Sequence, residues 1–123
     1  MNYTSIEQSI RLEKLGLDIM TADMFYNEPV DETYPKDIIV DTKYPMVIRE
    51  GQKHHLLEYG VPCWSLTALL ELMPNNFVEL TKDGGMYRMK AEQRYYSCLV
   101  ENPVDAAFEM IVYLIEKGHI KTK

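Results

Sequence analysis

Near its end the chain carries the segment that most constrains how it folds, a helix whose apolar side chains cover more than half of its circumference. Asn102-Pro103-Val104-Asp105 is a strong helix start: asparagine caps free N–H groups, proline needs no N–H partner at the first position, and aspartate faces the positive end of the helix dipole. Gly118 ends the helix after about Lys117. The apolar positions are Ala107, Phe108, Ile111, Val112, Leu114 and Ile115, and the polar ones are Asp105, Glu109, Tyr113 and Glu116. Such a helix needs cover on both flanks, from a sheet and a second helix or from another subunit.

A short helix and a small sheet that could supply this cover precede the segment. Ser65 can cap a helix whose apolar residues share one face, at Leu66, Leu69, Leu70 and Met73. Phe77–Thr81 and Met86–Ala91 alternate around Asp83-Gly84-Gly85, the pattern of a β-hairpin, and Arg94–Glu101 repeats the alternation as a third strand. We therefore predict an α+β fold in which a small three-stranded antiparallel meander packs against the buried C-terminal helix and the short leucine-rich helix.

The beginning of the chain predicts one clear helix and one weaker element. Thr4-Ser5-Ile6-Glu7 has the pattern of a capping box, with Thr4 as the N-cap, and predicts a helix over Ser5–Leu15. Asp18 and Thr21 can act as further N-caps, so we expect a short second helix or a turn over Ala22–Tyr26.

The segment between residues 27 and 62 predicts little regular structure. Its prolines exclude long helices or strands, and they stand at Pro29, Pro35, Pro45 and Pro62. Two short apolar runs, Ile38–Val40 and Met46–Ile48, are bounded by charge and are typical of brief strands. We expect at least one of these strands to form, and either could extend the meander.

Length and composition describe an ordinary globular chain. With 123 residues, 46% hydrophobic and 26% charged, we expect a single domain spanning residues 1–123. No apolar stretch approaches the roughly 20 residues of a membrane-spanning helix, and the N-terminus has no secretory signal pattern, so we expect a cytoplasmic protein. A net charge of −6 argues against general binding to nucleic acid, which depends on lysine and arginine.

Residues that could perform chemistry are present, but their spacing forms no known motif. Cys63 and Cys98 lie far apart and are predicted to be reduced, largely buried thiols, with Trp64 filling the core beside the first. Adjacent histidines at His54-His55, together with Asp41 or His119, complete no zinc pattern. We therefore predict no metal, no cofactor and no catalytic residue. The rival interpretation is a small hydrolase or nucleotide-modifying enzyme that uses Asp41, His54, His55 or Cys63.

One cluster of basic and aromatic residues lies on the predicted hairpin and third strand. The cluster consists of Tyr87, Arg88, Lys90, Arg94, Tyr95 and Tyr96, and all of these but Tyr96 are its candidate partner-binding residues. Arg88 and Lys90 share a strand face, where they could bind a protein partner. Tyrosines beside them could also stack on bases of single-stranded nucleic acid, and a plain solvated surface would have the same alternation.

Three blocks of the sequence together resemble a family of small uncharacterised proteins found in Bacteroidales genomes, their prophages and mobile elements. The blocks are Leu15-Gly16-Leu17 with Thr21-Ala22-Asp23-Met24, then Pro62-Cys63-Trp64-Ser65-Leu66 through Leu72-Met73-Pro74, and then Glu101 to Ile111. They cover roughly a third of the chain. The resemblance implies a cytosolic accessory role in phage or mobile-element biology, and it implies no activity, cofactor or catalytic residue for these positions.

These observations together lead us to expect a non-catalytic accessory or interaction protein. A protein partner or self-association, for example as a homodimer, fits the broad apolar surface of the C-terminal helix. A single-stranded nucleic-acid binder that uses Arg88, Lys90 and Arg94 remains a second alternative beside the small enzyme.

Overall fold

The computed structural model describes residues 2–27, 44–48, 51, 60–74, 78–91 and 95–122, and within them it forms two three-stranded antiparallel sheets and three α-helices. The elements are α1 (Ile6–Lys14), η1 (Ile19–Thr21), β1 (Met24–Asn27), β2 (Met46–Val47), β3 (Gly60–Cys63), α3 (Leu66–Glu71), β4 (Val78–Asp83), β5 (Met86–Ala91), β6 (Tyr95–Tyr96) and α4 (Pro103–Glu116). The sheet orders are β2-β1-β3 and β4-β5-β6. The chain is thus an α+β protein, as predicted.

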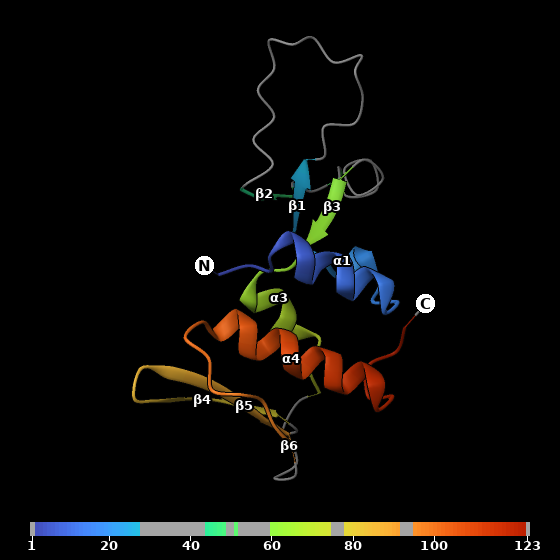
Figure 1. Cartoon of the computed structure of the whole chain (residues 1–123). Helices are drawn as coiled ribbons and strands as arrows, with labels where there is room; N and C mark the ends of the chain where they lie inside the picture. The colour runs from blue at the N-terminus through green and yellow to red at the C-terminus, as the bar shows by residue number, and fades with distance from the viewer. Residues whose placement is uncertain are drawn as a thin grey trace.

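The elements stack with α4 in the middle (Figure 1). The meander β4-β5-β6 contacts α4 on one side, and α3 contacts α4 from the other. The sheet β2-β1-β3 lies beyond α1, at the far end of the molecule from the meander. The main core lies between these layers and includes Trp64, Leu69, Met89, Met110, Ile111 and Leu114, none more than 1% exposed. This core confirms the predicted packing of the C-terminal helix on both the sheet and the leucine-rich helix.

The helix α4 begins and ends at the residues that its sequence indicates. Asn102 Oδ1 accepts a hydrogen bond from the Val104 N–H at 2.9 Å, Pro103 stands at the first position, and Gly118 follows with a φ of 78°. The helix α3 also has its predicted N-cap, because Ser65 Oγ accepts from the Ala68 N–H at 3.1 Å. Among the described residues, no helix has the length and apolar content needed to cross a membrane.

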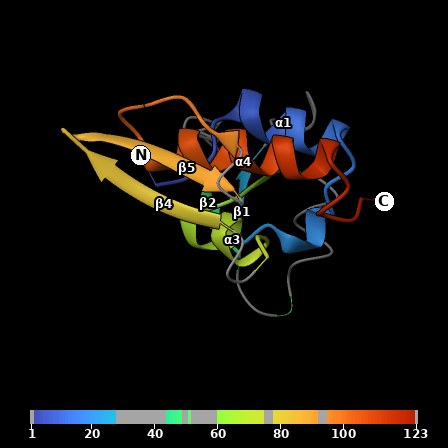
Figure 2. The ribbon, with the colours of Figure 1, turned by 90° about the horizontal axis from the view of Figure 1, so that it is seen from below.

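The predicted hairpin forms, and its third strand is shorter than expected. Gly84 and Gly85 have φ angles of 58° and 81°, the pair of positive values that a two-residue turn requires. The turn end of the hairpin projects past the beginning of α4 (Figures 1 and 2). Tyr96 pairs with Lys90, whereas Val100 pairs with Tyr87, so the third strand carries one extra residue between the two pairs.

The register of the third strand before this bulge decides which of its residues points inward. The Ser97 N–H donates to Met89 O at 2.9 Å, and Ser97 Oγ accepts from the Met89 N–H at 2.8 Å. Ser97 is therefore buried, and Cys98 is exposed. The prediction that Cys98 is buried was wrong, because Cys98 alternates with Tyr96, and the strand register turns that face outward beside Lys90.

The first helix forms, but it begins one residue later than predicted. Ser5 is its N-cap: Ser5 Oγ accepts from the Gln8 N–H at 3.1 Å, and Gln8 Oε1 accepts from the Ser5 N–H at 3.0 Å. Thr4, the expected cap, is fully buried, and its hydroxyl accepts from the Trp64 N–H at 3.1 Å. The N-cap is therefore Ser5 and not Thr4, because the Thr4 hydroxyl is used in a long-range hydrogen bond with Trp64.

The segment after α1 does not form the predicted second helix over Ala22–Tyr26. Asp18 does cap a short helix, since Asp18 Oδ1 accepts from the Met20 N–H at 3.0 Å, but that helix is the single 3-10 turn η1. Met24–Asn27 is strand β1, which pairs with β3 and with β2. The predicted strand at Met46–Ile48 is thus present as β2, yet it joins a second sheet instead of extending the meander. The predicted strand at Ile38–Val40 lies outside the described residues.

Candidate functional site

The outer face of the meander brings together part of the predicted basic and aromatic cluster. Met89 and Ala91 turn into the core, so Arg88 and Lys90 lie on the opposite face of β5. Tyr96 pairs with Lys90 and shares that face. Its ring centroid is 5.6 Å from Arg88 Cζ and 5.8 Å from Lys90 Nζ. We call Arg88, Lys90 and Tyr96 the basic-aromatic face.

The other predicted members of the cluster stand elsewhere. Tyr87 lies on the inner face of β5, where it packs against the core, and Lys82 Nζ is 5.5 Å from its ring centroid. Tyr95 pairs with Ala91 in β6, and its side chain lies outside the described part of the chain, as does all of Arg94. Tyr96 was missing from the predicted partner-binding residues, because only the register of the third strand shows which tyrosine lies beside Lys90.

The basic-aromatic face carries positive charge that its neighbours leave available. Glu79 pairs with Lys90 and Thr81 with Arg88 in the register of β4 and β5. Within the described residues, neither Arg88 nor Lys90 forms an ion pair, and the buried Arg88 Nε has no hydrogen-bond partner. A guanidinium that is stacked on a ring keeps its outward N–H groups free to bind a carboxylate through two parallel hydrogen bonds.

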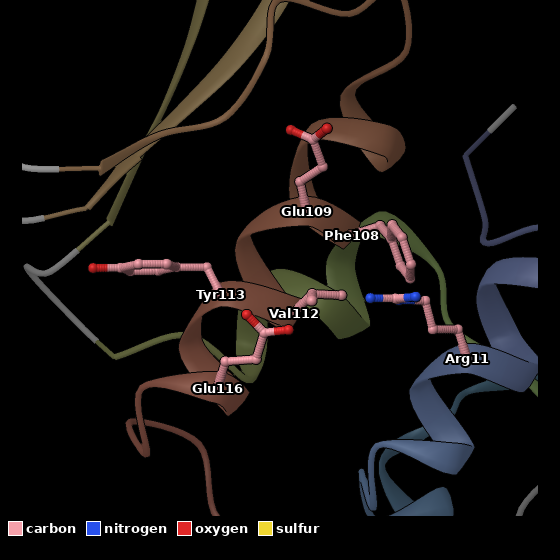
Figure 3. A pocket seen from close by; sticks show the side chains of 6 residues that line it. All are labelled: Arg11, Phe108, Glu109, Val112, Tyr113 and Glu116. Atoms are coloured by element: carbon pink, nitrogen blue, oxygen red, sulfur yellow. The ribbon is translucent and has the colours of Figure 1, made fainter.

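A second candidate site, absent from the predictions, is a groove between α1 and α4 (Figure 3). Its volume is about 390 Å³, and we call it the α1–α4 groove; it is lined by Arg11, Phe108, Glu109, Val112, Tyr113 and Glu116. Arg11 reaches from α1 towards Phe108 and Val112 (Figure 3). Glu109 Oε2 accepts from the Cys98 N–H at 2.9 Å, which holds that side chain in place. The sequence offered one signal for this site, namely that the apolar side chains of α4 extend beyond the face that a single core can cover.

Four residues were predicted for the rival enzyme, and Cys63 is the one that the structure describes. It lies in a buried polar cluster. Its side chain is fully buried, and its thiol donates to Thr4 O at 3.4 Å. Tyr26 Oη donates to the same carbonyl at 2.7 Å. Burial raises the pKa of the Cys63 thiol and also that of the Tyr26 phenol. A buried thiol that holds its proton is a poor nucleophile, so this cysteine packs the core.

The rival enzyme has three further candidate residues. Asp41, His54 and His55 lie outside the described residues. Across the segments that are described, no three histidine, cysteine or acidic side chains come close enough to hold a metal ion. Trp64 is fully buried, and its indole N–H donates to Thr21 Oγ1 at 2.9 Å, so it is the predicted core residue and no interface anchor.

The protonated state of Cys63 predicts a pH dependence of stability. Below its ordinary pKa of 9.0 the thiol keeps its proton in both the folded and the unfolded chain. Above that pH the unfolded chain loses the proton first, so the free energy of unfolding falls by about 1.4 kcal/mol per pH unit until the folded thiol ionises. Urea unfolding followed by circular dichroism at about pH 8 and about pH 10 measures this loss.

Cys63→Ser should show a loss of stability between these two pH values that is smaller by about 1 kcal/mol. An unchanged loss would contradict the assignment. Cys98→Ser, which removes an exposed thiol, is the matched control.

Comparisons with known proteins assign no role to either candidate site. No family model matches the chain, and neither the curated proteins nor the solved structures contain a match. The three blocks that carry the family resemblance lie around η1 and β1, in β3 and α3, and at the start of α4. These blocks are framework elements, so they say nothing about which surface binds a partner.

Proposed function

We propose that this protein is a non-catalytic interaction protein that binds a protein partner through the basic-aromatic face. The observation that carries the proposal is the position of Arg88 and Lys90 over one exposed tyrosine ring, Tyr96, which is 49% exposed. Tyrosine and arginine are the residue types that most often dominate binding energy at protein interfaces. Strands β5 and β6 hold the backbone of all three residues in place, so the entropy lost when a partner binds is that of the side chains alone.

The charge on this face supports an acidic segment as the partner's contribution. Arg88 and Lys90 lie two residues apart on one strand face and form no ion pair within the described residues. Two like charges held close together repel each other, and a carboxylate placed between them would relieve that repulsion. A partner that presents aspartate or glutamate in an extended segment would therefore fit this surface.

A protein partner is favoured over single-stranded nucleic acid by the charge of the whole chain. Nucleic-acid affinity grows with the number of phosphates that lysine and arginine neutralise, and the basic-aromatic face provides two cations on a chain of net charge −6. The accessory role in phage or mobile-element biology belongs to this proposal through the sequence resemblance alone. The cytoplasm is the compartment that we propose for it.

Site-specific photocrosslinking tests the proposal in cells that naturally produce the protein. A photoreactive amino acid at Thr81, an exposed position that pairs with Arg88, should yield an adduct with another protein. The same group at exposed Glu13 on α1, outside the meander, should not yield that adduct. Arg88→Glu in the Thr81 probe should lower the adduct yield by about tenfold or more, because it removes a central contact and adds a like charge.

The matched control is Lys82→Glu, which makes the same charge change on the other face of the meander and should leave the adduct unchanged. An adduct that persists at full yield in Arg88→Glu, or that forms equally from Glu13, would refute the proposed surface. An adduct that a nuclease digests would replace the protein partner by single-stranded nucleic acid.

A further inference from the structure

The side of α4 that lines the α1–α4 groove is partly apolar. Val104, Ala107, Ile111 and Leu114 form the buried side of this helix. Phe108 and Val112 lie beside them, partly buried against the core, and the rest of their surface forms the floor of the α1–α4 groove. An occupant of the groove would bury the part of these two side chains that the core leaves uncovered.

The charges of the groove are arranged in order across it. Figure 3 shows Arg11 on the α1 side, Phe108 and Val112 in the middle, and Glu109 and Glu116 on the other side. Within the described part of the chain, Arg11 and Glu116 form no side-chain hydrogen bond or ion pair. The groove thus presents a positive edge, an apolar floor and a negative edge. Arg11 and Glu116 are available to a partner, whereas Glu109 is hydrogen-bonded to the Cys98 N–H.

We propose that the α1–α4 groove binds the same groove of a second copy of this chain, forming a two-fold dimer. A two-fold axis that runs along α4 exchanges the two edges of the groove. It therefore places Arg11 of one copy against Glu116 of the other, twice, and brings Phe108 and Val112 of both copies together at the axis. The opposite arrangement, with antiparallel α4 helices, would place like charges together at each edge, so the proposal includes parallel α4 helices.

The observations favour a second copy over an unrelated partner because the groove is complementary to itself. One surface carries both members of each ion pair and an apolar floor that matches its own image. Both edges stand on helices that are tied together at the beginning of α4, where Gln8 Nε2 donates to Asp105 Oδ1 at 2.9 Å. The dimer uses neither Arg88 nor Tyr96, so a result that contradicts the dimer would not contradict the proposed partner-binding face.

Charge exchange between copies tests the dimer. Sedimentation velocity at protein concentrations from about 1 µM to about 1 mM should show a dimer of the unmodified protein, with a dissociation constant inside that range. Arg11→Glu and Glu116→Arg should each raise that constant by about tenfold or more, since each brings two pairs of like charges together. An equal mixture of the two variants should form a heterodimer with the original affinity, because opposite charges then meet at both places, one pair with its original sign and the other with its sign reversed. The double variant should dimerise with itself for the same reason.

The controls separate an interface from a loss of folding. Lys14→Glu makes the same charge change on α1 outside the groove and should leave the dimer intact. Circular dichroism should give the same spectrum for every variant. A protein that stays monomeric across the whole concentration range, single variants that dimerise as well as the original, or a mixture that fails to form the heterodimer would each overturn the proposal.

Discussion

Trp64→Ala is expected to lower the free energy of unfolding by about 3–5 kcal/mol, since it leaves a large cavity at the centre of the core. The side chain is fully buried, and it stands between β3 and α3, where it joins the sheet β2-β1-β3 to the main core. Its indole N–H also donates to Thr21 Oγ1, which ties η1 to the core. Urea unfolding followed by circular dichroism measures the loss.

Trp64→Phe is the matched variant for this prediction. Phenylalanine keeps much of the apolar contact but loses the hydrogen bond to Thr21, so we expect a smaller loss of about 1–2 kcal/mol. Equal losses for the two variants would mean that the hydrogen bond, and not the filled volume, is what this residue contributes.

Thr4→Val is expected to lower the free energy of unfolding by about 3 kcal/mol, although the two side chains have nearly the same shape. The Thr4 hydroxyl accepts from the Trp64 N–H at 3.1 Å and is hydrogen-bonded to Ser9 Oγ at 2.8 Å. Thr4 and Ser9 are both fully buried, so no water replaces these bonds. Valine therefore leaves buried polar groups without partners, each at a cost of about 1–3 kcal/mol. The measurement is again urea unfolding, compared with the unmodified protein.

Thr4→Ser separates the hydroxyl from the methyl group. Serine keeps the hydrogen bonds and removes one methyl group, so we expect a loss of about 1 kcal/mol. If serine destabilised the protein as much as valine does, the methyl group would be the important part of Thr4 and the polar cluster would be secondary.

The elements that could be predicted from sequence are those whose signals lie within a few residues. Asn102 and Pro103 start α4, Ser65 starts α3, and Gly84-Gly85 turns the hairpin, all as predicted. A cap or a two-residue turn is decided by hydrogen bonds and φ angles in its own neighbourhood, so its sequence pattern transfers directly to structure. The amphipathic pattern then predicted which helix would be buried.

The elements that were mispredicted depend on partners far away in the chain. Thr4 and Ser5 are both good N-caps by themselves, and the contact of Thr4 with Trp64, sixty positions later, decides between them. Met24–Asn27 became a strand because β3 pairs with it along its whole length. Cys98 is exposed because the pairing of the third strand with β5 turns the face of Tyr96 and Cys98 away from the core.

The candidate sites also have one part that the sequence predicts and one part that depends on distant contacts. That Arg88 and Lys90 share a face follows from strand periodicity, which sequence alone determines. That Tyr96 lies between them depends on strand register, and that Arg11 faces Phe108 and Val112 depends on how α1 packs beside α4. Local hydrogen bonds and periodicity act over a few residues and are written in the order of the chain. Register and helix packing are set by the shape of the whole core, so only the tertiary structure decided which surfaces this protein presents.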